Sequence, residues 1–312
     1  MKILITGAAG LIGSHLCDIM LQDGHEVTGI DDLSYGDVKN IPQGVDFIQG
    51  LVENLPQYEG KWDVIYHLAS WKKVWDGSIL SSDVMSVNFA MTQAVVDRAL
   101  ADGSKLVFAS TSDIYGNSET FHEEDDITMG APVSIRYSYA LSKWHSEQYI
   151  LNMVSECKLD ATIVRVFGCA SSRSNRGWSG GHVPLFTDLA LKGKDITIHG
   201  DGLQTRSISH AIDIATGFSK CFNPKDKLYK VSGIVNIGTT QQTTVKYIAE
   251  YIIDKTNSKS KVKYIPSVEV FQDYKEIKAR FPNVDKAVAT FNYKVNYTTE
   301  QVVDEIIQEF SK

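Results

Sequence analysis

The sequence predicts an α/β fold in which helices cover both faces of a doubly wound parallel sheet, with a smaller α/β domain formed mostly by the C-terminal part. Three observations lead to this fold class. Short apolar segments alternate with longer segments of helical period, a glycine-rich turn joins the first of each kind, and the alternation ends after about Phe167. Repeated strand–helix–strand units place their strands in one parallel sheet.

Five short apolar or β-branched segments in the first half have the composition of strands that are buried on both faces. These expected strands are Ile3–Ile5, Val27–Ile30, Val64–Leu68, Leu106–Ser110 and Thr162–Val166. Three segments of helical period lie between them, at Ile12–Gln22, Ser82–Leu100 and Tyr139–Glu156. In the second half we expect helices at Val183–Lys192, Ile212–Phe222 and Thr298–Phe310, and a short strand at Val235–Ile237.

The composition argues against a nucleic-acid-binding or membrane-spanning protein. The formal net charge of -7 comes without a block of basic residues, and no apolar stretch is long enough to cross a bilayer. The 4 cysteines are widely separated and none of the 8 histidines has metal-ligand spacing, so we expect neither disulfides nor a metal. The chain starts directly with a predicted strand and shows no secretory leader, which favours a cytoplasmic protein.

The turn Gly7-Ala8-Ala9-Gly10-Leu11-Ile12-Gly13 follows the first predicted strand and opens the first predicted helix. In such a turn the first glycine permits a tight bend, the second lets the backbone approach a pyrophosphate, and the third allows close packing. Asp31 ends the second predicted strand, where a carboxylate accepts hydrogen bonds from ribose hydroxyls and repels a 2′-phosphate. No Arg or Lys follows in Asp32–Tyr35, so the sequence favours NAD over NADP.

These patterns divide the chain into two predicted domains. Residues 1–167 form a Rossmann-type NAD-binding domain, to which residues 208–238 return. Residues 168–207 and 239–312 form the substrate-binding domain.

Tyr139 and Lys143 are four residues apart in a predicted helix and therefore share one of its faces. A free tyrosine has a pKa of about 10. A nearby ammonium group and the positive nicotinamide ring both stabilise a phenolate, so we expect a lowered pKa that suits a general base. Tyr137 has no lysine four residues later, because that position is Leu141, and we reject it as the base.

The glycine spacing, the chain length and the C-terminal half resemble the short-chain dehydrogenase/reductase superfamily, in its extended branch of NAD-dependent nucleotide-sugar epimerases and dehydratases. Further landmarks of this resemblance are His67-Leu68-Ala69-Ser70, Asn88, Ser110-Thr111-Ser112-Asp113-Ile114-Tyr115-Gly116, the Tyr139/Lys143 pair and Gly200-Asp201-Gly202-Leu203-Gln204-Thr205-Arg206. The resemblance implies a nucleotide-diphosphate sugar as substrate. It also implies a homodimer that forms through the helices near Ser82–Leu100 and Tyr139–Glu156.

The resemblance further assigns individual residues to the two ligands. Cofactor contacts fall on Gly7, Gly10, Leu11, Ile12, Gly13, Asp31, Leu68, Ala69, Ser70, Lys72, Asn88, Tyr139 and Lys143. Substrate contacts fall on Lys72, Thr111, Arg173, Arg206 and Arg280. Arg206 and Arg280 resemble two arginines that bind the diphosphate, which suits planar and permanently charged groups. A solvated loop arginine is the simpler interpretation of Arg173.

Thr111 and Asp113 bear on the type of reaction. Thr111 matches a hydroxyl that orients the reacting sugar hydroxyl together with Tyr139, whereas Asp113 occupies the position of the base in sugar 4,6-dehydratases. A cap at the end of a strand explains Asp113 equally well. We predict a 4-epimerase that works through a transient 4-keto sugar. The alternative is a 4,6-dehydratase or decarboxylase with Asp113 as an extra base, and a non-catalytic NAD-binding sensor is the third hypothesis.

Overall fold

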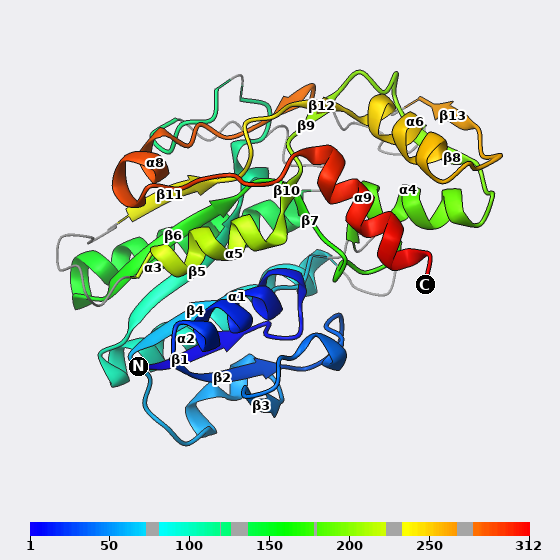
Figure 1. The fold of residues 1–312 in the computed structure, drawn as a ribbon. Helices are drawn as coiled ribbons and strands as arrows, with labels where there is room; N and C mark the ends of the chain where they lie inside the picture. Colours follow the sequence, from blue (N-terminus) through cyan, green and yellow to red (C-terminus); the bar gives the residue numbers. More distant parts are fainter. Residues whose placement is uncertain (73–80, 119, 126–136, 178–179, 223–232, 267–276) are drawn as a thin grey trace.

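The protein is described by a computed structural model over residues 1–72, 81–118, 120–125, 137–177, 180–222, 233–266 and 277–312. Its main body is a 7-stranded sheet in the order β11-β6-β5-β4-β1-β2-β3. Every neighbouring pair of strands in this sheet is parallel. The chain changes direction across the sheet between β1 and β4, which confirms the doubly wound fold that the sequence predicts (Figure 1).

The sheet consists of β1 (Lys2–Thr6), β2 (Glu26–Asp31), β3 (Asp46–Gln49), β4 (Val64–His67), β5 (Lys105–Thr111), β6 (Asp160–Val166) and β11 (Gly233–Ile237). The helices are α1 (Leu11–Gln22), α2 (Ser81–Asp102), α3 (Ser138–Cys157), α4 (His182–Leu191), α5 (Ala211–Lys220), α6 (Val245–Lys255), α8 (Asp285–Phe291) and α9 (Thr299–Phe310). Short strands follow β6 and complete the C-terminal part: β7 (Cys169–Ala170), β8 (Ile196–His199), β9 (Thr205–Arg206), β10 (Ser209–His210), β12 (Thr243–Thr244), β13 (Val262–Ile265) and β14 (Ala279–Arg280).

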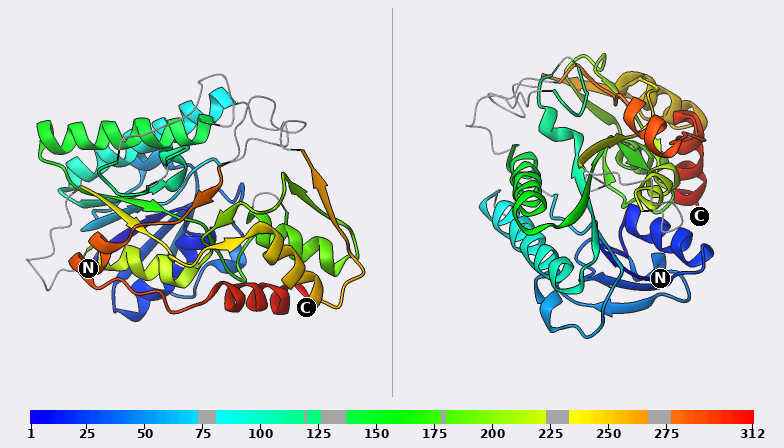
Figure 2. Two further views of the ribbon diagram at one scale, coloured as in Figure 1. Left: turned by 90° about the horizontal axis from the view of Figure 1, so that it is seen from above. Right: turned by 90° about the vertical axis from the view of Figure 1, so that its left-hand side faces the viewer.

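Helices cover both faces of the sheet. On one face α2 packs against α3, and on the other α1 packs against α5 (Figure 2). Successive side chains of a strand point to opposite faces. Ile3 and Ile5 of β1 therefore join the core beneath α1 and α5, whereas Leu4 joins the core beneath α2 and α3.

The C-terminal part has its own apolar core. β8 and β13 pair in parallel, and α4, α6 and α9 pack around the core beside them (Figure 1). β11 lies next to β6 in the main sheet, so the chain returns there from the C-terminal part. The boundaries of the two domains stay a prediction. Within the described ranges, no helix is long and apolar enough to span a bilayer.

Among the elements that the sequence analysis did not include are β3, α6, α8 and the short strands of the C-terminal part. β3 is an edge strand whose four residues are exposed or half-buried, so it lacks the continuous apolar run of the inner strands. α6 has a readable signal, because its buried residues Val245, Ile248, Ala249 and Ile252 recur at helical spacing.

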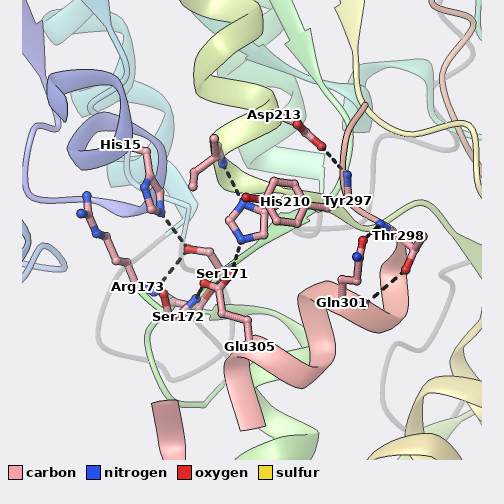
Figure 3. A network of polar contacts seen from close by, with 12 residues as sticks. His15, Ser171, Ser172, Arg173, His210, Asp213, Tyr297, Thr298, Gln301 and Glu305 are labelled. Atoms are coloured by element: carbon pink, nitrogen blue, oxygen red, sulfur yellow. Dashed lines mark hydrogen bonds and ion pairs between the residues drawn. The ribbon is translucent and has the colours of Figure 1, made fainter. Parts of the chain in front are cut away.

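A buried polar network joins α1 to the C-terminal helix α9 (Figure 3). His15 Nε2 of α1 lies 3.1 Å from Ser171 Oγ, and His210 Nε2 lies 2.5 Å from Glu305 Oε2 of α9. His210 Nδ1 accepts a hydrogen bond from the backbone N–H of Ile212, so the proton of the neutral ring is on Nε2 and points to Glu305. His210 therefore serves this network, which ties the two ends of the chain together.

This network makes folding stability depend on pH. Burial, helped by the charge of Arg173, lowers the pKa of His15 from 6.5 to about 3. Burial opposes the charge of Glu305, but hydrogen bonds from His210 and Ser172 outweigh it and lower the pKa of Glu305 from 4.5 to about 2. Both groups hold fewer protons folded than unfolded, so stability is present above the unfolded pKa and is lost as the pH falls.

We expect the free energy of unfolding to fall below about pH 6.5 by about 1.4 kcal/mol per pH unit for His15, with Glu305 adding a similar slope below about pH 4.5. Denaturant unfolding of the wild type and of His15→Gln, followed across this range, measures the effect. In His15→Gln, the free energy of unfolding should fall less steeply between about pH 6.5 and 4.5, by the contribution of one proton, which is about 1.4 kcal/mol per pH unit. Identical slopes in the two proteins would contradict the assignment to His15.

Candidate active site

The turn before α1 has the shape of a cradle for a pyrophosphate. Gly7 has φ +72°, and a Cβ there would lie 2.8 Å from the backbone N of Ala69. A Cβ on Gly13 would clash with the carbonyl oxygen of Gly7. α1 also carries no acidic residue in its first turn, so its N-terminal N–H groups suit an anion. These residues fit the NAD that the sequence predicts.

Asp31 lies at the end of β2, where it faces the same turn. Its Oδ2 accepts a hydrogen bond from Ala9 N–H at 3.0 Å, and its Oδ1 accepts one from Leu33 N–H at 2.9 Å. Burial raises the pKa of Asp31, while the two backbone hydrogen bonds oppose that rise. The carboxylate is thus held in place by the backbone, and each oxygen keeps acceptor capacity for ribose hydroxyls.

We expect Gly13→Ala to abolish stable NAD binding, because its new methyl group collides with the Gly7 carbonyl and forces the cradle open. The nucleotide released from purified protein on denaturation, separated by chromatography, measures the loss. Gly24→Asn is the matched control, since Gly24 lies beyond the end of α1 at a left-handed position that asparagine tolerates. A folded Gly13→Ala protein with a full complement of NAD would contradict the cradle.

The loop after β4 lies against Gly7 of the cradle and is linked to α3 by hydrogen bonds through Asn88. Asn88 of α2 holds this loop: its Oδ1 accepts from Trp71 N–H at 2.8 Å and from Ser70 Oγ at 3.3 Å. Its Nδ2 donates to the carbonyl of Trp71 at 3.0 Å and to Ser142 Oγ of α3, also at 3.0 Å. Asn88 is 2% exposed, and these bonds use all its hydrogen-bonding groups. The side chain of Asn88 thus positions the loop and α3 relative to each other, and its predicted contact with the cofactor stays a prediction.

The structure brings most of the predicted catalytic residues together around Tyr139. The hydroxyls of Ser70 and Thr111 hydrogen-bond with the Tyr139 side chain. Lys72 Nζ lies 5.9 Å from the centre of the tyrosine ring. Lys143 Nζ, one turn along α3, donates to the carbonyl of Ala109 at 2.8 Å.

The electrostatics of Tyr139 and Lys143 differ from the expectation. Burial raises the pKa of Tyr139, and the charge of Asp113 raises it further, although the hydrogen bond with Ser70 opposes both. Burial also lowers the pKa of Lys143 to about 7. Each group is desolvated and so favours its neutral form. Lys143 is not among the groups that lower the pKa of Tyr139 in the protein alone, so a lowered pKa stays a prediction for the NAD-bound protein.

Asp113 and Arg280, which the sequence assigned to different tasks, form an ion pair between Oδ1 and Nη1. Asp113 is tied to the catalytic group as well, because its backbone N–H donates to Thr111 Oγ1 at 3.1 Å. Arg280 of β14 is the register partner of Arg206 in β9, so the two predicted substrate arginines are neighbours. Arg206 Nη1 is held by the carbonyls of Thr205 at 2.8 Å and Ile277 at 2.9 Å.

Arg173 is not brought to this group. Its guanidinium pairs with Asp18 of α1 at 2.7 Å, and its side chain lies beside His15 (Figure 3). The described contacts thus favour a loop anchor over the predicted contact with substrate.

The structure also brings Cys169, which the sequence analysis did not single out, to the site. Its thiol is close enough to Tyr139 and Lys72 for electrostatic interaction with both side chains. Burial raises the pKa of Cys169 to about 11, and no spacing in the sequence marks a lone cysteine.

The comparisons with known proteins agree with this geometry. Residues 3–238 match the family described as the NAD dependent epimerase/dehydratase family. The UDP-N-acetyl-alpha-D-glucosaminuronate decarboxylase of Bacillus cytotoxicus is 34% identical over 320 residues, which cover 99% of this chain and 97% of that protein. The UDP-glucuronic acid decarboxylase 1 of Danio rerio is 28% identical over 315 residues, covering 100% of this chain and 73% of that protein.

A solved structure shows the same fold. The UDP-glucose 4-epimerase of Thermotoga maritima, determined with UDP-glucose, superimposes with a TM-score of 0.86 at 23% identity. The match covers 100% of this chain and 99% of that chain.

Proposed function

Because the chain belongs to the NAD-dependent epimerase/dehydratase family, we propose that it is a UDP-sugar-acid decarboxylase. It oxidises carbon 4 of the sugar and then releases the carboxyl group on carbon 5 as CO2. The observation that carries this proposal is the ion pair between Asp113 and Arg280 beside Tyr139. The similarity to two UDP-sugar-acid decarboxylases supports it.

The first step is common to every enzyme considered for this site. NAD, when bound, supplies a reversible acceptor for the hydride of carbon 4. Tyr139 accepts the proton of the carbon-4 hydroxyl as that hydride leaves, and Thr111 orients the hydroxyl. The hydrogen bond between Thr111 and Tyr139 stabilises the phenolate before the proton arrives. The product is a 4-keto sugar.

The second step depends on the substituent of carbon 5. A 4-keto sugar acid is a β-keto acid, so it loses CO2 without a base: the bond to the carboxyl group breaks, and its electron pair moves to the ketone oxygen as an enolate. Tyr139 returns its proton to that oxygen. Carbon 5 then takes a proton from solvent while the ketone re-forms and the enol proton passes back to Tyr139. As the hydride returns to carbon 4, Tyr139 gives that proton to the carbon-4 oxygen, which completes the turnover. Dehydration differs, because a base must remove the carbon-5 proton.

Arg280 favours loss of CO2 over loss of water. A guanidinium in contact with a carboxylate stabilises its charged form, so Asp113 is a weaker base than a carboxylate without such a partner. Arg280 and Lys72 also provide positive charge beside Tyr139 that attracts a sugar carboxylate. Asp113 then acts by orienting Arg280, in place of the role as extra base that the sequence suggested.

The 4-epimerase remains the second candidate. It shares the first step, and it requires only that the 4-keto sugar turns over in the site before the hydride returns. Tyr139, Thr111 and Lys143 serve both reactions, so none of them separates the two. The ion pair of Asp113 with Arg280 favours the decarboxylase, because epimerisation of a neutral sugar makes no use of a cation that attracts a carboxylate.

Incubation of the NAD-loaded protein with matched pairs of substrates tests the proposal. UDP-glucuronate and UDP-N-acetylglucosaminuronate are the acids, and UDP-glucose and UDP-N-acetylglucosamine are their neutral counterparts. We expect CO2 from at least one acid and no change in the neutral sugars. Isobaric products from the neutral sugars, with no CO2 from either acid, would favour the 4-epimerase.

A further inference from the structure

His182 lies in the C-terminal part, where the Nε2 atom of its imidazole ring is buried. It is the first residue of α4, after Gly181, which has φ +90° and contributes no side-chain cap. The Nε2 atom of His182 is buried and has no hydrogen-bond partner among the described residues. Burial, together with the charge of Arg206, lowers the pKa of His182 to about 4, so the ring is neutral near pH 7. A buried polar atom without a partner calls for a ligand or another explanation.

A second orphaned atom belongs to the same neighbourhood. The Nε atom of Arg280 is buried and, within the part of the chain that the structure describes, has no hydrogen-bond partner, although Nη1 pairs with Asp113. Arg280 is the register partner of Arg206, and residues in register on adjacent strands point to the same face. α4 has no acidic residue in its first turn, so its N-terminus adds positive potential. Two buried nitrogen atoms without a described partner thus lie near Arg206, and such an arrangement suits a site that receives an anion.

We propose that His182 binds the substrate's diphosphate beside Arg206 and takes up a proton when the diphosphate binds. That the ligand is a nucleotide sugar rests on the proposed function. That His182 takes part in binding it is a separate inference, which the proposed function does not require. Arg206 is the charged group that acts on His182 among the described residues, and the ring of Phe186, 5.8 Å away, carries no charge. A diphosphate placed between them reverses the field at the imidazole and stabilises its protonated form.

This arrangement couples affinity to pH. The complex holds one proton more than the separate components, so binding strengthens as the pH falls toward the pKa of the free ring. Titration calorimetry with UDP-glucose in two buffers of different ionisation heat measures the proton uptake. UDP-glucose suits this purpose because its diphosphate diester does not titrate near neutral pH. The Tyr139→Phe protein, loaded with NAD, serves as parent so that no hydride transfer contributes heat.

His182→Leu in this parent should bind UDP-glucose about tenfold more weakly near pH 6 and take up no proton. His182→Gln keeps an N–H donor, so it should retain most of the affinity and lose only the pH dependence. Uridine, which has no phosphate, should bind all three proteins alike. Thermal midpoints and bound NAD, compared with the parent, control for folding.

Equal affinity and equal proton uptake in the parent and His182→Leu would overturn the inference while leaving the proposed function intact. An equal loss for uridine would overturn the assignment to phosphate. If the parent binds neither UDP-glucose nor UDP-glucuronate, the nucleotide-sugar class is wrong, and the proposed function fails together with the inference.

Discussion

We expect Tyr139→Phe to lower kcat by about 10²–10⁴-fold, which is the usual contribution of a positioned general base. The change removes the atom that accepts the carbon-4 proton and leaves the ring in place. Substrate and NAD should still bind, because the cradle and the arginines lie on other elements. Rates of CO2 release, together with the absorbance of bound NADH after mixing with substrate, measure the effect.

Tyr137→Phe is the matched control for this prediction. Tyr137 is the N-cap of α3 and packs against Ile277 and Leu141, two residues before Tyr139 in the chain. Its variant should keep kcat within about a few-fold of the wild type. A Tyr139→Phe enzyme with near wild-type turnover would show that Tyr139 is not the general base.

The second large effect is expected for Arg280→Gln. It removes the cation that attracts the sugar carboxylate, and a lost charge-assisted contact corresponds to about 10–100-fold. We expect CO2 release to fall by that factor while oxidation at carbon 4 continues, so bound NADH should accumulate. Rapid mixing, with NADH and CO2 followed in parallel, separates the two steps.

Asp113→Asn is the companion variant, because it breaks the same ion pair from the other side. Arg280 then keeps its charge but loses its fixed orientation, so CO2 release should fall by no more than about tenfold. A complete loss of CO2 release in Asp113→Asn, with hydride transfer intact, would show instead that Asp113 is the extra base. Loss of NADH formation in Arg280→Gln would show that the arginine serves substrate binding in general.

The sequence predicts local and periodic features well. The inner strands are continuous apolar runs, and the glycines of the turn before α1 are required by contacts within a few residues or with the neighbouring strand end. Tyr139 and Lys143 follow from their spacing in a predicted helix, and Thr111 follows from the resemblance to the family. β3 was not predicted, because an edge strand with half-buried residues has no continuous apolar run.

Contacts between distant segments could not be predicted in this way. Asp113 and Arg280 are 167 residues apart, and they meet because β14 pairs with β9 at the edge of the site. Asn88 matches a family landmark, but its role depends on three partners in a loop and in α3. The raised pKa of Tyr139 depends on burial, which spacing does not report.

A sugar acid that is oxidised at carbon 4 by way of Tyr139 should lose its carboxyl group, and deuterium from the solvent reports this loss. The NAD-loaded enzyme is given its UDP-sugar acid in D2O, and the product is analysed by mass and NMR. The account predicts a product that has lost CO2 and carries one deuterium, at carbon 5. An isobaric product inverted at carbon 4, with no deuterium at carbon 5, would contradict it.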